Sequence, residues 1–113
     1  MLKPGIILGL LVTTSQVFAA SMEVSCEVKN SLDPVFQQKL VLEESDKNKL
    51  IGDFNEFSFY LTSKGNEVVE LQTLNRYEPT RSYATGALRE KDDFVDLAIW
   101  KRDYLMEVRC SRL

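Results

Sequence analysis

Hydrophobic residues recur at every second position along most of the chain, which is the period of a β-strand with one buried face. In the clearest example, the segment 22–28, they alternate with charged or polar residues. The same period predicts six further strands, at 39–43, 56–61, 67–74, 81–89, 94–100 and 104–111, joined by short polar turns. The sequence therefore predicts an all-β fold of about seven strands.

The segment 34–44 has two possible interpretations. Its leucines alternate with charged residues, as in a strand, but Asp33 followed by Pro34 is also a typical helix start. Phe36 and Leu40 have helical spacing as well. We prefer the strand and keep a short helix as the alternative.

Two glycines mark places where the strands should turn or distort. Residues 63–66 include Gly65 and have the composition of a hairpin turn, because glycine readily takes the positive φ of tight turns. Gly86 falls inside a predicted strand, where a glycine usually marks a β-bulge or a bend. We therefore expect a hairpin at 63–66 and a local distortion at Gly86.

The two cysteines, Cys26 and Cys110, lie in the first and last predicted strands. Both follow the alternation of the hydrophobic residues around them, so both side chains should face the core. A disulfide needs Cα atoms about as close as those of neighbouring strands. We therefore expect a Cys26–Cys110 disulfide, adjacent N- and C-terminal strands, and an antiparallel meander closed into a small barrel or a curled sandwich.

The first 19 residues have the organisation of a signal peptide. Lys3 precedes an uncharged apolar stretch at 5–12, and Val17 and Ala19 are residue types that signal peptidase accepts. The stretch is shorter than the roughly 20 residues that span a bilayer. The sequence therefore predicts a signal peptide at 1–19, a single soluble β domain at 20–113, and a periplasmic or secreted location without membrane insertion.

Charge and composition argue against several classes of function. The chain without its first 19 residues keeps 13 of the 14 basic and all 17 acidic residues, a formal charge of −4. This argues against a nucleic acid partner, because phosphate binding needs a basic surface. The absence of histidine removes the commonest general base and metal ligand. We expect no metal and no cofactor.

Acidic pairs are the remaining candidates for catalysis. They are Glu43–Glu44 and Asp92–Asp93. Neighbouring residues on a strand face opposite ways, and such pairs in turns are usually solvated. We therefore expect that the chain is not an enzyme.

The strand predicted at 94–100 has the most informative surface. If its aliphatic residues face the core, Phe94 and Trp100 face outward. Tyr83 and Arg89 lie close in the sequence, and aromatic residues together with arginines are typical of binding surfaces. These four residues are our candidate binding residues. The alternative is that Trp100 fills the core or that the aromatic residues stiffen the sheet.

One short segment resembles part of a known class of proteins. Tyr83-Ala84-Thr85-Gly86 is similar to the Ser-Gly-containing strand and loop of exported, disulfide-bonded barrels that inhibit lysozymes. Threonine stands where these inhibitors have serine, and residues 89–92 replace their aromatic-rich Lys-Gly segment. The resemblance covers a few residues and implies an inhibitor-like mode of protein binding.

These observations lead to a ranking of functions. The first is an exported, non-enzymatic binding module whose expected partner is another protein. The second is a structural domain of an envelope assembly. The third is a small carboxylate-dependent hydrolase.

Overall fold

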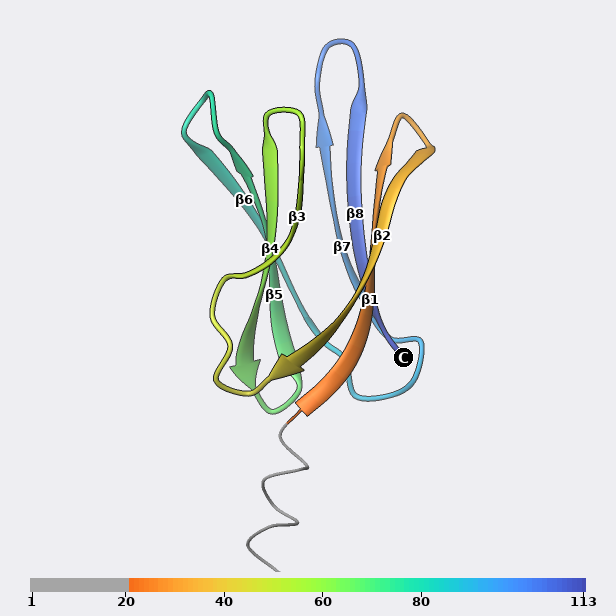
Figure 1. Ribbon diagram of the computed structural model, residues 1–113, viewed down its shortest axis with the longest axis vertical. Helices are drawn as coiled ribbons and strands as arrows, with labels where there is room; N and C mark the ends of the chain where they lie inside the picture. The colour runs from red at the N-terminus through yellow and green to blue at the C-terminus, as the bar shows by residue number, and fades with distance from the viewer. Residues whose placement is uncertain (1–20) are drawn as a thin grey trace, which may run out of the picture.

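The computed structural model describes residues 21–113, which form eight antiparallel strands. In chain order these are β1 (Ser21–Asn30), β2 (Asp33–Glu43), β3 (Lys49–Phe54), β4 (Phe57–Gly65), β5 (Val68–Asn75), β6 (Thr80–Ala87), β7 (Phe94–Trp100) and β8 (Leu105–Arg112). They make two four-stranded sheets in the orders β2-β1-β8-β7 and β3-β4-β5-β6 (Figure 1). The all-β fold predicted from the alternation is confirmed.

The signal peptide predicted at 1–19 lies outside the described residues and stays a prediction. Strand β1 begins at the same end of the molecule as the C-terminus (Figure 1). Within residues 21–113, no helix has the length and hydrophobicity needed to cross a lipid bilayer.

The two sheets are consecutive parts of one meander. Each strand pairs with the next in the chain except at the β2–β3 and β6–β7 boundaries, and β1 pairs with β8. At the β6–β7 boundary, Gly86 packs against Val95 and the Lys101 ammonium lies 3.4 Å from the Glu78 carboxylate. The strands therefore follow one another around a shared core in chain order.

The disulfide joins the first and last strands, as the sequence predicted. Cys26 and Cys110 are direct partners in the β1–β8 ladder, with Cα atoms 4.0 Å apart, and both are fully buried. The bond links residues separated by 84 positions. In the chain-entropy model, a loop of this length contributes about 4.5 kcal/mol, because the cross-link restricts the unfolded chain.

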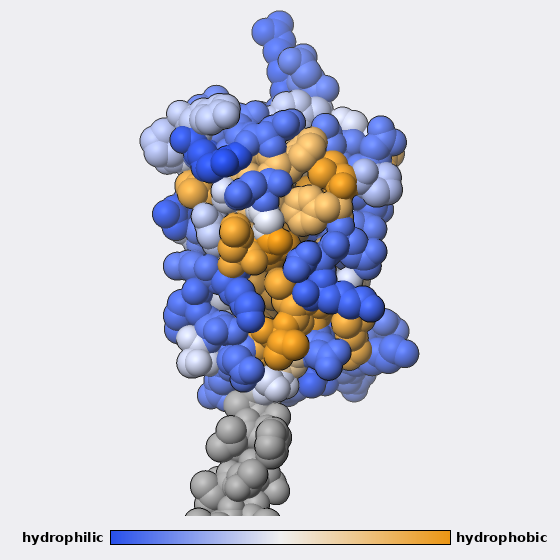
Figure 2. Space-filling view, viewed as in Figure 1, coloured by the Kyte–Doolittle hydropathy of each residue, from blue (hydrophilic) through white to orange (hydrophobic). Residues whose placement is uncertain are grey.

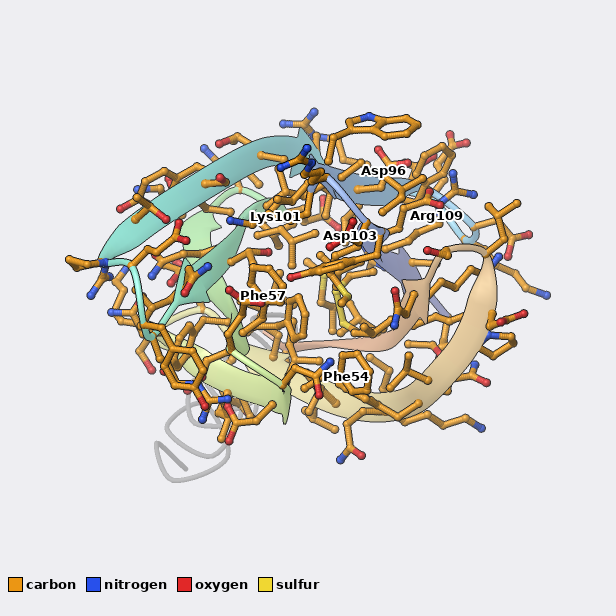
Figure 3. The ribbon with its side chains drawn as sticks, turned by 90° about the horizontal axis from the view of Figure 1, so that it is seen from above. Phe54, Phe57, Asp96, Lys101, Asp103 and Arg109 are labelled. Carbon is orange, nitrogen blue, oxygen red and sulfur yellow. A yellow bond between two sulfur atoms is a disulfide. The ribbon has the colours of Figure 1, made fainter. Side chains whose placement is uncertain are left out.

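Aromatic side chains connect the two sheets where no ladder joins them. Phe57 and Phe59 of β4 are buried, and Phe36 of β2 meets the Phe59 ring edge-on with the centroids 6.4 Å apart. Seen from above, Phe57 points into the space between the sheets (Figure 3). Hydrophobic side chains are also visible as a band down the middle of the face shown in Figure 2, between the two sheets. The β2–β3 boundary is therefore closed by side-chain packing.

Strand β3 is the element that the sequence pattern did not predict. Leu50 and Ile51 are adjacent hydrophobic residues followed by Gly52, so the period of two is lost there. The β3–β4 ladder shifts register at the same place, between Leu50 and Gly52. An irregular strand of this kind has no alternation to detect.

The helical alternative for residues 34–44 was wrong. Asp33–Glu43 forms strand β2 and pairs with β1 over its length, with one register shift in β1 between Val28 and Lys29. The ladder with β1 overrides the local helix-start signal of Asp33 and Pro34, because tertiary pairing outweighs a weak propensity.

Gly86 does not form the expected bulge. The β5–β6 register runs without interruption through the Val69–Gly86 pair. A Cβ atom at Gly86 would lie 3.3 Å from the Val95 Cβ, so glycine serves here to let β7 approach β6 closely. The predicted hairpin at 63–66 is present, and Gly65 has a positive φ of 84° before the turn at Asn66 and Glu67.

Candidate functional site

The outer face of β7 carries two exposed aromatic rings. Val95 is buried in the core, whereas Phe94 and Trp100, on the opposite alternation, are 49% and 78% exposed. The sequence pattern placed these three side chains on the correct faces. The two rings lie at opposite ends of β7, with Asp96 and Ala98 exposed between them.

An arginine covers the Phe94 ring. The Arg109 guanidinium of β8 lies 4.0 Å from the centroid of the ring and 3.0 Å from the Asp96 carboxylate. In the β7–β8 ladder Arg109 stands directly opposite Asp96, and both side chains project from the outside of the sheet (Figure 3). Phe94, Asp96 and Arg109 therefore form one cluster, held by a cation–π contact and an ion pair.

Arg89 lies elsewhere. It belongs to the β6–β7 loop, and its guanidinium donates to the Asn66 carbonyl oxygen of the β4–β5 turn at 3.3 Å. Its backbone N–H donates to the Asp93 carboxylate at 3.0 Å. Arg89 is thus directed to the neighbouring turn, and Arg109 is the arginine that lies against Phe94.

Tyr83 lies on the outer face of β6, beside β7. It is 53% exposed and pairs with Gln72 in the β5–β6 ladder. The Gly86–Val95 and Glu78–Lys101 contacts align β6 antiparallel to β7. This alignment puts Tyr83 level with Ala98, between the two aromatic residues of β7.

Trp100 borders a shallow hollow of about 380 Å³ at the end of the molecule where four turns gather (Figure 1). The hollow is formed by the β1–β2 turn and the β7–β8 hairpin, and Leu32 on its other side is 71% exposed. Leu32 has a positive φ of 73°, which is uncommon for a leucine. The Ser31 N–H donates to the Leu105 carbonyl oxygen at 2.7 Å, which ties the two turns together.

A partly buried hydrogen-bond network supports this end of the molecule. The Glu56 carboxylate accepts from the Tyr104 hydroxyl at 2.6 Å and from the Asn75 amide at 2.8 Å. The hydrogen bond from Tyr104, and to a smaller extent the one from Asn75, lowers the pKa of Glu56. Burial and the hydrogen bond to Glu56 raise the pKa of Tyr104 to about 12. The network fixes the β7–β8 hairpin to the β3–β4 and β5–β6 turns.

The acidic pairs considered for catalysis lie in turns or at strand ends. Glu43 and Glu44 are both exposed next to the β2–β3 turn. The Asp93 carboxylate accepts from the Arg89 and Glu90 backbone N–H groups, so it organises the β6–β7 loop.

Sequence reasoning missed Arg109 and Leu32. Alternation does place Arg109 on the outer face of its strand, but its position opposite Asp96 depends on the register of the β7–β8 hairpin. Leu32 is separated from Trp100 by 68 positions and reaches it through the pairing of β1 with β8. Comparison with family models, curated proteins and solved structures finds no match.

Proposed function

We propose that this chain is an exported binding module that recognises another protein through the outer face of β7 and the adjoining hairpin end. The observation that carries the proposal is the exposure of Trp100 beside Leu32. Tryptophan and arginine are the residues most enriched among those that dominate protein–protein affinity. The β7 face has both, with Arg109 stacked on Phe94.

The shape of this end supports protein recognition. The β7–β8 hairpin reaches beyond the three neighbouring turns (Figure 1). Its base is held by the hydrogen bonds among Glu56, Asn75 and Tyr104. A supported hairpin loses little conformational freedom on binding, so more of the contact energy appears as affinity.

Export is part of the proposal. A buried disulfide is compatible with a periplasmic or extracellular protein, since such bonds persist in oxidising compartments. The residues preceding Ala20 have the composition that signal peptidase accepts. Intact-mass measurement of the exported protein should show Ala20 as its first residue, and a mass that still includes Met1 would contradict this.

Trp100→Ala tests the recognition surface, with Leu50→Ala as the control. Leu50 is also exposed, at 50%, but it lies near the start of β3 in the other sheet, away from the hairpin end. Both substitutions should cost less than about 1 kcal/mol of stability, because neither side chain is in the core. The mature protein, immobilised as bait for periplasmic or culture fluid, should retain a saturable partner that Trp100→Ala loses and Leu50→Ala keeps.

Other outcomes would reject this function. A stability loss of about 3 to 5 kcal/mol for Trp100→Ala would indicate a core role for the ring. Equal partner retention by the Trp100→Ala protein and the unmodified protein would place recognition elsewhere. Either result would favour the structural role in an envelope assembly.

A further inference from the structure

The outer face of β7 and β8 holds two aromatic residues, each with a carboxylate nearby. At one end, Phe94 and the Asp96 carboxylate share a cation, the Arg109 guanidinium, which stands opposite Asp96 in the ladder. The guanidinium contacts the ring at 4.0 Å and the carboxylate at 3.0 Å. The chain therefore contains one complete arrangement of ring, carboxylate and arginine.

At the other end, within residues 21–113, no cation–π contact is found at Trp100 and no ion pair at Glu107. Ala98 and Glu107 are direct partners in the β7–β8 ladder, and Trp100 lies two residues from Ala98 on the same outer face. Ala98 is exposed and has a short side chain, and Trp100 and Glu107 are diagonal neighbours across the ladder, within the reach of long side chains. A planar cation placed over Ala98 would reach both.

The basic residue that stands opposite Glu107 in the β1–β8 ladder is paired with another acid. Lys29 of β1 stands opposite Glu107 in the β1–β8 ladder, but its ammonium lies 3.4 Å from the Glu27 carboxylate. No ion pair within 4.0 Å involves Glu107 in the described part of the chain, residues 21–113. Glu107 also borders a small hollow of about 110 Å³ that Glu27, Lys29 and Arg109 line with it. Because Lys29 is paired with Glu27 and Arg109 with Asp96, neither of these cations forms an ion pair with Glu107.

We infer that Ala98, Trp100 and Glu107 form a pocket for an arginine side chain of the protein partner. The inference rests on the proposed recognition function and names the chemistry of the partner. A guanidinium stacks its planar face on an indole while its N–H groups donate to a carboxylate. Lysine lacks the planar face, so arginine fits the pocket better.

The test uses a small probe, the blocked tripeptide N-acetyl-Gly-Arg-Gly-amide, titrated into the mature protein and followed by NMR. Two signals should shift together: the indole N–H of Trp100, the one tryptophan of the chain, and the backbone amide of Ala98. Both shifts should reach a plateau as the peptide concentration rises. The glutamine analogue of the peptide should leave both signals in place. Glu107→Gln should weaken arginine binding about fivefold, the loss expected for an exposed ion pair.

Two further variants separate the pocket from general attraction to an acidic protein. Ala98→Leu fills the space and should abolish the shifts while leaving the ring and the carboxylate in place. Glu23→Gln removes an exposed acid from the outer face of β1 and should leave binding unchanged. Equal shifts with the glutamine peptide, or an affinity indifferent to Glu107→Gln and Ala98→Leu, would overturn the inference.

The arginine pocket and the recognition function can fail separately. If a captured partner depends on Trp100 but binds the Glu107→Gln and Ala98→Leu proteins normally, the pocket is wrong and the recognition surface stands. If the tripeptide binds as described but no captured partner depends on Trp100, the pocket stands and the proposed function fails.

Discussion

Replacing Gly52 by alanine should destabilise the fold by displacing the Phe36 ring. A Cβ atom at Gly52 would lie 2.7 Å from the Phe36 Cζ and 2.9 Å from its Cε1, closer than van der Waals contact allows. Phe36 is packed edge-on against the buried Phe59, so its ring cannot move without losing core contacts. The clash lies at the β2–β3 boundary, where side-chain contacts join the sheets and no backbone ladder does.

Two opposing effects determine the size of the change. Overpacking of a core site costs about 1 to 3 kcal/mol. Replacing glycine by alanine stabilises the protein by about 0.4 to 1 kcal/mol, because an unfolded chain with alanine has less conformational entropy to lose on folding than one with glycine. For Gly52→Ala we expect a net loss of about 1 to 2 kcal/mol, which lowers the Tm of a domain of this size by roughly 5 to 15 °C.

The assay is chemical unfolding followed by circular dichroism in two backgrounds. Once Phe36→Ala has removed the ring, Gly52→Ala should become stabilising by about 0.4 to 1 kcal/mol. Gly65→Ala is the control, because its positive φ of 84° makes alanine unfavourable regardless of Phe36. The reasoning is refuted if Gly52→Ala has the same sign and size in both backgrounds.

Three other predictions concern the disulfide and the Glu56–Tyr104 hydrogen bond. Replacing Cys26 and Cys110 together by serine should cost about 2 to 5 kcal/mol, and thiol titration of the unreduced native protein should find no reactive sulfhydryl. Hydrogen bonding lowers the pKa of Glu56 below its usual 4.5, so the stabilisation from its carboxylate is present above pH 4.5 and is lost as the pH falls through the lowered pKa. The difference in stability between the native protein and Glu56→Gln should therefore shrink as the pH falls below 4.5. Because the pKa of Tyr104 is raised to about 12, native stability should fall between about pH 10 and pH 12, and Tyr104→Phe should flatten that fall. A pH dependence unchanged by either substitution would contradict the structural role of the hydrogen bond.

The sequence by itself determined which side of each regular strand faces the core. A period of two identifies buried and exposed faces directly, so the outward positions of Phe94 and Trp100 could be read from the chain. The shared inward phase of Cys26 and Cys110 also identified the pairing of the terminal strands, because a disulfide leaves few alternatives. These conclusions needed only local alternation and one covalent constraint.

Alternation is lost where the strands become irregular. Strand β3 escaped prediction because adjacent Leu50 and Ile51 interrupt the period and its ladder with β4 shifts register. From the sequence, Gly86 was interpreted as a bulge or a bend, whereas the structure shows a close approach to Val95. A glycine inside a strand gives the same local signal in all of these cases. Only the neighbouring strand reveals which of them applies.

The composition of the candidate site was decided by tertiary structure. Strand period tells which face a residue occupies but not which residue stands across from it, and that depends on hairpin register. Register places Arg109 over Phe94 and directs Arg89 to the β4–β5 turn. It also sets Glu107 opposite Ala98, beside Trp100. Leu32 and Trp100 border one hollow because the β1–β8 ladder brings the β1–β2 turn to the β7–β8 hairpin. The cysteines indicated that the terminal strands pair, but not which turn residues meet at their end.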